Sequence, residues 1–192
     1  MNASGVEQLA PLSDLFARVI AHTAPASVAI LGVAGGNGLS RIDPKITTRI
    51  VGVDIHQGYL DAVASRFAGL PGLELHCADL ASIRVSCAPV DLVHVALVFE
   101  HAGTELCLEN AVAMVVPGGC LSVVLQLPSE IHQAVSPTNF ASLQALQEGF
   151  QLIEPSWLME TMAARFLRLE SELRLPLPSG KGLWHGLFRR EQ

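Results

Sequence analysis

The chain has 192 residues, of which 50% are hydrophobic and only 16% are charged, and its formal net charge at pH 7 is −6. This length suits one domain whose core needs neither disulfides nor a metal, and an acidic balance without any basic run argues against nucleic acid as a partner. The hydrophobic excess indicates a parallel sheet covered on both faces, a subunit interface, or both. We therefore expect a single domain that can form a homo-oligomer, such as a homodimer.

The residues that would mark a metal site, a membrane segment or a compartment give mostly negative signals. Four cysteines lie too far apart for a zinc or redox motif, and we interpret them as small buried residues in a reducing cytoplasm: Cys77, Cys87, Cys107 and Cys120. The histidines lack the spacing of metal ligands, so no metal is expected. The N-terminus has no basic stretch before an apolar core, and Asp91 and the "PGG" of residues 117–119 interrupt the most apolar runs. We expect a cytoplasmic protein without a membrane segment.

Hydrophobic periodicity predicts an amphipathic helix over residues 12–22, which Ser13 can cap. Apolar runs then predict five strands, at residues 27–33, 46–55, 73–80, 90–102 and 120–127. Two helices are predicted between them, at residues 57–70 and 105–115. The nearly continuous apolar run at 90–102 indicates a central strand that is covered on both faces. Strands that alternate with helices in this way are joined by right-handed parallel crossovers.

The C-terminal part departs from this alternation. Residues 128–153 begin as a polar, proline-punctuated loop and become helical after Asn139, which predicts a loop and helix inserted after the fifth strand. Residues 164–178 and 182–191 predict two more strands, and the turn at 179–182 is too short for a crossover, so they must form an antiparallel hairpin. The expected fold class is α/β, with a mostly parallel seven-stranded sheet that ends in this hairpin.

Small residues and acids follow the ends of the predicted strands. The segment "AGGNG" (34–38) lacks bulky side chains, so its backbone can approach a ligand closely and turn its amides toward a carboxylate or a ribose. The motifs "VGVDI" and "HCADL" place Asp54 and Asp79 at the ends of the next two strands. Ligands of open parallel sheets bind beyond the carboxyl ends of the strands, so these residues are expected in one site.

From about residue 27 to its end, the chain resembles the class I S-adenosylmethionine-dependent methyltransferases, and within them small bacterial proteins of unassigned substrate. The resemblance rests on the order and spacing of "ILGVAGGNG", "VGVDI", "HCADL", "DLVHVALVFEH" and "VPGGCLSVVLQ". It implies a three-layer Rossmann-like fold in a single domain over residues 1–192, with a helix in segment 1–26 that covers the site. It also implies S-adenosyl-L-methionine as the cofactor.

The resemblance further implies a role for each site residue. Asp54 would accept hydrogen bonds from two vicinal ribose hydroxyls, a bidentate contact suited to a carboxylate. Asp79 would accept from the exocyclic amine of adenine, the Leu80 amide would meet a ring nitrogen, and Ile55 would form an apolar wall for the purine. The other expected cofactor contacts come from the glycine loop and the end of the fourth strand: Gly32, Ala34, Gly35, Gly36, Asn37, Gly38 and Phe99.

Two positions of the glycine loop depart from the family pattern. The family usually has an acid at the position of Gly32, where it helps to hold the methionine amino group, and a glycine at the position of Ala34. Alanine is acceptable where the backbone angle is ordinary. The missing acid has two interpretations: carbonyls near Phe99 or the Gly32 backbone hold the amino group instead, or cofactor affinity is weak or absent. We favour retained binding because Asp54 and Asp79 occur together.

Several of these residues also have a purely structural interpretation. Gly35, Gly36 and Gly38 could form a tight turn, and Asp79 could cap the turn that follows it. We interpret Asp91 as a structural acid at the start of the fourth strand. A dinucleotide-dependent dehydrogenase is disfavoured because the glycine offsets do not fit G-x-G-x-x-G.

The end of the fourth strand carries the candidate catalytic residues. Glu100 and His101 lie where the family places catalytic or substrate-facing groups, although the start of a loop explains them nearly as well. If the methyl acceptor is a hydroxyl or an ammonium, a base must take its proton. Our hypothesis is that His101 is this base, with Glu100 as the other candidate. Residues of the fifth strand and the loop after it are expected to shape the acceptor pocket: Gln126, His132 and Asn139.

The predicted function is transfer of a methyl group from S-adenosylmethionine to a small-molecule acceptor. Attack on a sulfonium is an in-line displacement with an activated leaving group, so the protein mainly has to align the reactants in a dry pocket. Two other classes of function stay open. One is a non-catalytic protein that binds the nucleoside cofactor, and the other is a scaffold that holds a partner through its apolar surface.

Overall fold

A computed structural model describes residues 6–128, 150–178 and 180–192. Within these residues the helices are α1 (Val6–Thr23), α2 (Gln57–Arg66), α3 (Phe99–Ala102), α4 (Glu105–Ala113) and α6 (Pro155–Ala163), with a short 3-10 helix η1 (Leu39–Arg41). The strands are β1 (Ser27–Leu31), β2 (Arg49–Asp54), β3 (Leu73–Cys77), β4 (Val90–Ala96), β5 (Val115–Leu127), β6 (Leu167–Pro176) and β7 (Gly182–Arg190). None of these helices is long and apolar enough to cross a membrane.

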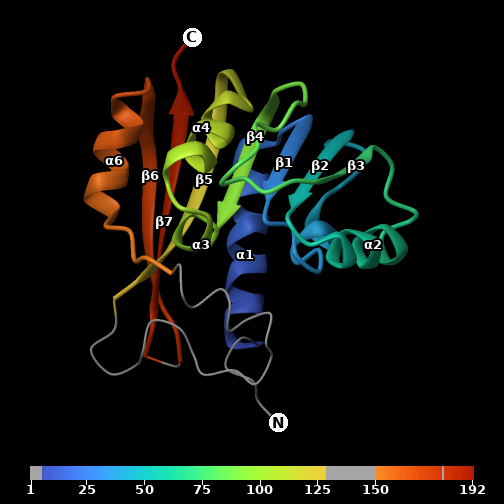
Figure 1. Ribbon diagram of the computed structural model, residues 1–192, viewed down its shortest axis with the longest axis horizontal. Helices are drawn as coiled ribbons and strands as arrows, with labels where there is room; N and C mark the ends of the chain where they lie inside the picture. The colour runs from blue at the N-terminus through green and yellow to red at the C-terminus, as the bar shows by residue number, and fades with distance from the viewer. Residues whose placement is uncertain (1–5, 129–149, 179) are drawn as a thin grey trace.

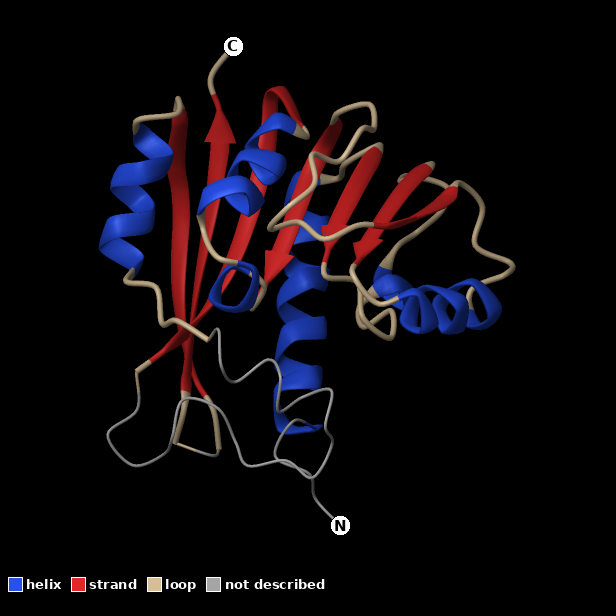
Figure 2. Ribbon diagram, viewed as in Figure 1, coloured by secondary structure: helices blue, strands red, loops and turns tan. Residues whose placement is uncertain are grey.

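The strands form one sheet in the order β3-β2-β1-β4-β5-β7-β6 (Figures 1 and 2). Neighbours from β3 to β5 pair in parallel, and β7 pairs antiparallel with both β5 and β6. The strand order reverses between β1 and β4, which makes this the topological switch point of the sheet. The predicted α/β class, the mostly parallel seven-stranded sheet and its antiparallel C-terminal hairpin are therefore confirmed.

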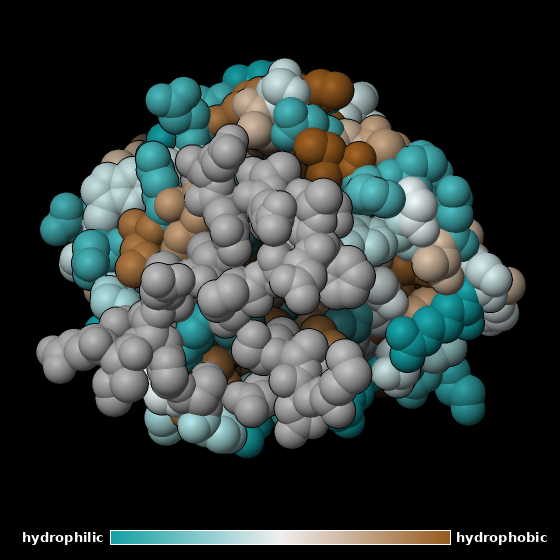
Figure 3. Space-filling view, turned by 60° about the horizontal axis from the view of Figure 1, so that its bottom comes forward, coloured by the Kyte–Doolittle hydropathy of each residue, from teal (hydrophilic) through white to brown (hydrophobic). Residues whose placement is uncertain are grey.

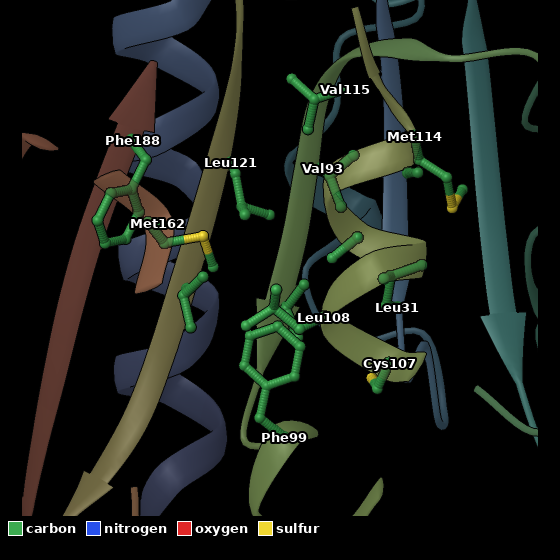
Figure 4. Close-up of a cluster of buried hydrophobic side chains, with 14 of the residues drawn as sticks. Leu31, Val93, Phe99, Cys107, Leu108, Met114, Val115, Leu121, Met162 and Phe188 are labelled. Atoms are coloured by element: carbon green, nitrogen blue, oxygen red, sulfur yellow. The ribbon is translucent and has the colours of Figure 1, made fainter. Parts of the chain in front are cut away.

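A helical layer covers each face of the sheet, so that strands such as β1 are buried on both sides. On one face, α3, α4 and α6 pack on the sheet, and Figure 4 shows part of that core, where Phe99, Leu108 and Met162 lie beside Val93 and Leu121. On the other face, α1, η1 and α2 contribute to a second core that includes side chains from β1, β2 and β4. The chain thus has the three layers expected of a Rossmann-like fold.

The largest difference from the predicted elements concerns the fourth strand, which was expected to run to residue 102. The strand β4 ends at Ala96, because Leu97 has a positive φ of 57° that turns the chain. The backbone then becomes helical, and the amides of His101 and Ala102 both donate to the Val98 carbonyl. In the sequence, residues 99–102 follow directly on the apolar run of the fourth strand, but they form the short helix α3.

Other boundaries move for identifiable reasons. The predicted start of β2 at residue 46 is wrong because residues 43–47 form a turn, in which the amides of Ile46 and Thr47 donate to the Asp43 carbonyl. Conversely, β5 begins earlier than residue 120. Its "PGG" segment forms a bulge, since Val90 pairs with Val115 while Leu92 already pairs with Cys120.

The remaining differences are shorter, apart from one helix that was not predicted. The strands β1 and β3 end at residues 31 and 77 rather than 33 and 80, and the helices α2 and α4 end at 66 and 113 rather than 70 and 115. Helix α1 is longer than predicted and spans 6–23 rather than 12–22. The hairpin strands span 167–176 and 182–190. Helix α6 had no predicted counterpart. The helix expected after Asn139 lies largely outside the described residues, and residues 150–153, at its predicted end, are not helical.

Two expectations about single residue types can be compared with the structure. Asp91 links the starts of β1 and β4, because its Oδ2 accepts from both the amide and the hydroxyl of Ser27 at 2.8 Å, which agrees with its structural interpretation. The expectation of four buried cysteines is wrong for Cys77, which is exposed, while Cys107 and Cys120 are buried. Cys77 lies on β3, at the edge of the sheet, where fewer elements cover it.

Candidate functional site

The candidate site lies at the edge of the sheet where the parallel strands end, the lower edge in Figure 1. Figure 3 turns this edge toward the viewer and shows hydrophobic surface interspersed with hydrophilic surface. The loop after β1, the turns after β2 and β3, the short helix α3 after β4, and the end of β5 all lie along this edge. Their residues come together because parallel strands present their carboxyl ends on the same side.

Asp54, the last residue of β2, is the best-defined polar group of the site. It is 7% exposed, and its two carboxylate oxygens each accept one backbone amide: Oδ2 from Ala34 at 2.8 Å and Oδ1 from His56 at 2.9 Å. Each oxygen retains a second acceptor position. The carboxylate is thus fixed between the loop after β1 and the start of α2, and it can still accept two hydroxyl groups.

Ala34 is held in a backbone conformation that the sequence did not suggest. Its φ is 43°, in the left-handed region, where a side chain beyond glycine costs about 1–2 kcal/mol. The condition under which alanine was judged acceptable, an ordinary backbone angle, is therefore not met. The strained conformation turns the Ala34 amide toward Asp54, and this hydrogen bond offsets part of the cost.

The glycines of the loop allow two phenylalanine rings of the helical layer to pack closely against the backbone. A Cβ added to Gly36 would lie 2.6 Å from the Phe67 ring, and one added to Gly38 would lie 2.8 Å from the Phe16 ring. These two glycines therefore serve the contact of the loop with the helical layer. Gly35 has no atom near its Cβ position, so it is the glycine around which space is open.

Helix α1 is tied to the same loop. The side-chain amide of Asn37 donates to the Leu9 carbonyl at 3.0 Å, and Arg41 pairs with Asp14. The N-terminal half of α1 therefore lies against the glycine loop. Asn37 is occupied by this structural contact.

The turn after β3 is organised by Asp79. Its carboxylate accepts from the Ala81 amide at 2.9 Å and from the Ser82 hydroxyl at 2.7 Å, so the turn-capping interpretation of Asp79 is correct as far as these bonds go. The strand ends β2 and β3 are joined by the Ala78 amide, which donates to the Asp54 carbonyl at 3.0 Å. Asp79 thus follows the adjacent strand two residues beyond the register partner of Asp54, Cys77.

A buried asparagine that the sequence reading missed supports this turn. Asn110 in α4 is 3% exposed, donates from Nδ2 to the carbonyls of Leu80 and Ile83, and accepts from the Val85 amide. Removing it would leave three buried or half-buried backbone groups without partners. Its sequence signal was an amide side chain within the apolar face of a predicted helix. Leu80 itself is buried, whereas Ile55 is 65% exposed at the mouth of the site.

The space in which the family has an acid is filled in this chain. Gly32 has a φ of 73°, and a Cβ there would lie 2.5 Å from Cγ2 of Val98. Val98 belongs to the turn between β4 and α3, and a β-branched side chain cannot swing away easily. An acid at position 32 is therefore excluded by both the backbone angle and Val98, and no carboxylate replaces it at that position.

Glu100, one of the two catalytic candidates, is fully buried in α3. Its Oε1 accepts the Gln126 amide at 2.7 Å, so it supplies the bond that β4 no longer offers to β5 beyond Ala96. Its Oε2 is buried and has no hydrogen-bond partner within the described part of the chain. Burial raises the pKa of Glu100 to about 7, although the Gln126 amide acts in the opposite direction. Near neutral pH this carboxyl group therefore holds a proton much of the time.

The other candidate, His101, is exposed at the end of α3. Its ring meets the Phe150 ring edge-on, with 5.1 Å between the ring centroids. Gln126 is 6% exposed at the end of β5, and the Phe99 side chain is buried in the core, so Phe99 can offer a ligand only its backbone. The predicted acceptor residues His132 and Asn139 lie outside the described residues. Within the described part of the chain, no cluster of three or more potential metal ligands occurs.

We predict that Glu100→Gln changes the pH dependence of stability. The folded protein keeps the Glu100 proton up to about pH 7, while an unfolded glutamate loses it near 4.5. The folded state therefore binds more protons between these values, and the free energy of unfolding falls as the pH rises through them. Glutamine keeps an acceptor for the Gln126 amide and does not titrate. Relative to wild type, the variant should gain up to about 3 kcal/mol between pH 5 and pH 8.

Urea unfolding at several pH values measures this difference. Glu105→Gln, which changes an exposed glutamate of the neighbouring helix, is the control and should show little pH-dependent difference. A difference between Glu100→Gln and wild type that stays constant from pH 5 to pH 8 would contradict the prediction.

We also predict that the acid of the family is incompatible with this loop because of Val98. Gly32→Asp should lower the free energy of unfolding by about 2–4 kcal/mol, from the left-handed backbone and from overpacking. Val98→Ala in the same chain should recover the packing share, which gives a coupling of about 1–2 kcal/mol in a double-mutant cycle. Strict additivity of the two changes in urea unfolding would show that Val98 is not the obstacle.

Comparisons with known proteins agree with this geometry. Residues 28–119 match the family model described as a methyltransferase domain. The N-methyltransferase NodS from Bradyrhizobium japonicum WM9 is 14% identical, with 95% of this chain and 96% of that chain covered and a TM-score of 0.70. The cyclase SpnF is 14% identical, with 94% and 80% covered and a TM-score of 0.72. A search of curated proteins found no significant match.

A third solved structure is the 1,6-didemethyltoxoflavin-N1-methyltransferase from Burkholderia thailandensis, with 15% identity, 96% and 78% covered and a TM-score of 0.70. At these identities the structural likeness establishes the fold only. The glycine loop, Asp54 and Asp79 all lie within residues 28–119, the range that the family model matches. Residues 28–119 therefore match a methyltransferase domain, within the fold that these solved methyltransferase structures share.

Proposed function

We propose that this protein transfers the methyl group of S-adenosylmethionine to a small-molecule acceptor. The observation that carries the proposal is the position of Asp54, whose carboxylate is oriented by two amides at the end of β2 and keeps one acceptor position on each oxygen. Two vicinal ribose hydroxyls match these positions. Structural neighbours support the choice of ligand, since NodS and the 1,6-didemethyltoxoflavin-N1-methyltransferase were crystallised with S-adenosylhomocysteine.

The rest of the cofactor would lie along the same edge of the sheet. The exposed Ile55 side chain directly after Asp54 offers an apolar surface to the purine, and the turn that contains Asp79 and Leu80 faces its edge. The open space at Gly35 allows the backbone to approach the ligand. With Val98 over Gly32, the amino group of the methionine part would be held by backbone carbonyls rather than by a carboxylate.

The chemistry asks little of the side chains. The sulfonium is already an activated leaving group, so alignment of acceptor and methyl group supplies most of the rate enhancement. Of the two catalytic candidates, His101 is exposed at the carboxyl edge, whereas Glu100 is buried and bonded to the Gln126 amide. His101 therefore takes the acceptor's proton where the acceptor carries one, and Glu100 positions the end of β5.

A second candidate function is binding of the cofactor or its nucleoside without methyl transfer. It is favoured by the filled acid position at Gly32, because the methionine amino group loses its usual charged partner. SpnF, which shares this fold, is a [4+2]-cyclase, so the fold also serves other chemistry. The two candidates share the adenosine site and differ in whether a methyl group is transferred.

Ligand binding gives the first test. S-adenosylhomocysteine at a hundred times its dissociation constant should add about 2.7 kcal/mol to the stability, seen as a rise in Tm. Asp54→Asn should weaken its binding at least about tenfold in calorimetry, because a charge-assisted contact to the ribose is lost. Asp61→Asn, an exposed acid of α2, is the matched control and should bind normally. No binding at millimolar ligand would overturn both candidates.

The same titration with 5′-methylthioadenosine examines the role of the missing acid. This ligand carries the adenosine and the thioether but no amino acid group. Where a carboxylate holds the amino group, its loss costs about 1.5–3 kcal/mol. Here the two ligands should differ in affinity by less than about tenfold. A larger difference, up to the roughly 150-fold that 3 kcal/mol corresponds to, would show that a charged group holds the amino group.

Substitution of His101 tests the catalytic assignment. His101→Ala should lower kcat for a hydroxyl or ammonium acceptor by about 10²–10⁴-fold, because proton transfer is lost, while the affinity for S-adenosylhomocysteine stays unchanged. A panel of small acceptors with radiolabelled S-adenosylmethionine provides the readout. Unchanged turnover in the variant would remove His101 from the mechanism, and no turnover by wild type on any acceptor would favour the non-catalytic candidate.

A further inference from the structure

A cavity that is separate from the candidate site lies on the opposite side of α1. It has a volume of about 360 Å³ and is formed by the C-terminal half of α1 and the hairpin strands β6 and β7, with Leu15, Val19, Leu173 and Leu187 among its lining residues. The candidate site contacts the other half of α1, at Leu9. Ligand sites in proteins occupy about 300–1,000 Å³, so this cavity is large enough for a small molecule.

A row of buried polar side chains leads to this cavity through the core. His94 on β4, Ser122 on β5 and His185 on β7 stand on neighbouring strands and are 5%, 0% and 6% exposed. The Ser122 hydroxyl lies 3.0 Å from Nδ1 of His94 and 3.0 Å from Nε2 of His185. One hydroxyl has one proton, so it donates to one imidazole and accepts from the other.

Both imidazoles are neutral at physiological pH. Burial lowers the pKa of His94 to about 3, with a further contribution from His185, and burial lowers the pKa of His185 to about 4. Three buried polar groups would destabilise the core if they were unpaired. The hydrogen bonds of the row pair these groups with one another inside the sheet. The Nδ1 atom of His185, on the far side of the ring from Ser122, is not used by the row.

The Nδ1 side of the His185 ring belongs to the cavity. The Nε2 atom of His185 is used by Ser122, the ring lines the cavity, and no polar atom in the described part of the chain bonds to Nδ1. When Ser122 donates to His185, Nδ1 carries the proton and is a donor directed at a ligand. The cavity therefore combines apolar side chains with Nδ1 of His185 as a fixed hydrogen-bonding group, and the Ser171 hydroxyl also lines it.

The charges around the cavity favour an anion. Glu170 lines it, but this carboxylate is paired with Arg189 at 3.0 Å. Arg18 and His22 of α1 also line it, and in the described residues neither has an ion-pair partner. After this pairing the Arg18 guanidinium at the rim is the charge without a partner among the described residues.

We propose that this cavity binds a small amphipathic carboxylate, of the class of medium-chain fatty acids. The chain packs against the leucine and valine side chains, and the carboxylate accepts hydrogen bonds from the Arg18 guanidinium and from Nδ1 of His185. An apolar body matches the apolar part of the lining, and one negative charge complements the Arg18 guanidinium. This site is independent of the proposed methyl transfer, since it uses none of the residues at the carboxyl edge of the sheet.

Calorimetry and NMR of the full chain with sodium decanoate, below its micelle concentration, test the proposal. One equivalent should bind saturably, and decanol should bind about tenfold more weakly because it lacks the charge. Arg18→Gln should reduce decanoate affinity about tenfold. Arg174→Gln changes an exposed arginine on the same hairpin whose side chain points away from the cavity face, and it should bind normally.

A second variant guards against an effect on folding. Leu173 is 37% exposed, so Leu173→Glu should fold, and its carboxylate should abolish decanoate binding by repulsion. Far-ultraviolet circular dichroism and S-adenosylhomocysteine binding report whether either variant is intact. The proposal is overturned if decanoate binding does not saturate, or if both variants bind decanoate as wild type does. It is also overturned if wild type binds no decanoate and light scattering shows that it is a dimer which Leu173→Glu converts to a monomer.

Discussion

The two hydrogen bonds that Asp54 accepts are the constraint on which the candidate site depends. One side chain ties the loop after β1 to the start of α2, through the amides of Ala34 and His56. The cost is a left-handed alanine, which persists because the surrounding bonds fix it. The same contact that orders the loop also orients the carboxylate toward the space above it. Loop order and ligand recognition are therefore one feature of the structure.

Acids at other strand ends act in a similar way. Glu100 joins α3 to β5 by accepting the Gln126 amide, and Asp91 joins the starts of β1 and β4 through Ser27. Few residues of this chain are charged, and several of the less exposed ones bridge elements that the ladder bonds of the sheet do not reach. A parallel sheet needs such bridges because its ladder stops where a neighbouring strand ends. These bridges lie at both ends of the strands.

Much of the sheet could be predicted because strand periodicity and the order of motifs are local signals. The motifs "VGVDI" and "HCADL" placed Asp54 and Asp79 at strand ends, and the rule that ligands bind there grouped the two acids in one expected site. The end of β4 could not be predicted, since residues 97–102 are as apolar as the strand before them. The contact of Val98 with Gly32 and the row through Ser122 depend on which strands become neighbours, and that information is in no single segment.

Strand β5 connects the two buried titrating systems, since it carries both Ser122 and Gln126. The histidines of the Ser122 row have lowered pKa values, so the stability they contribute is lost as the pH falls below 6.5 toward 4 and 3. Glu100 has a raised pKa, so its contribution is lost as the pH rises from 4.5 to about 7. The two effects oppose each other between pH 4.5 and 6.5. Below that window only the histidines act, so acid should loosen the centre of the sheet while Glu100 is already protonated.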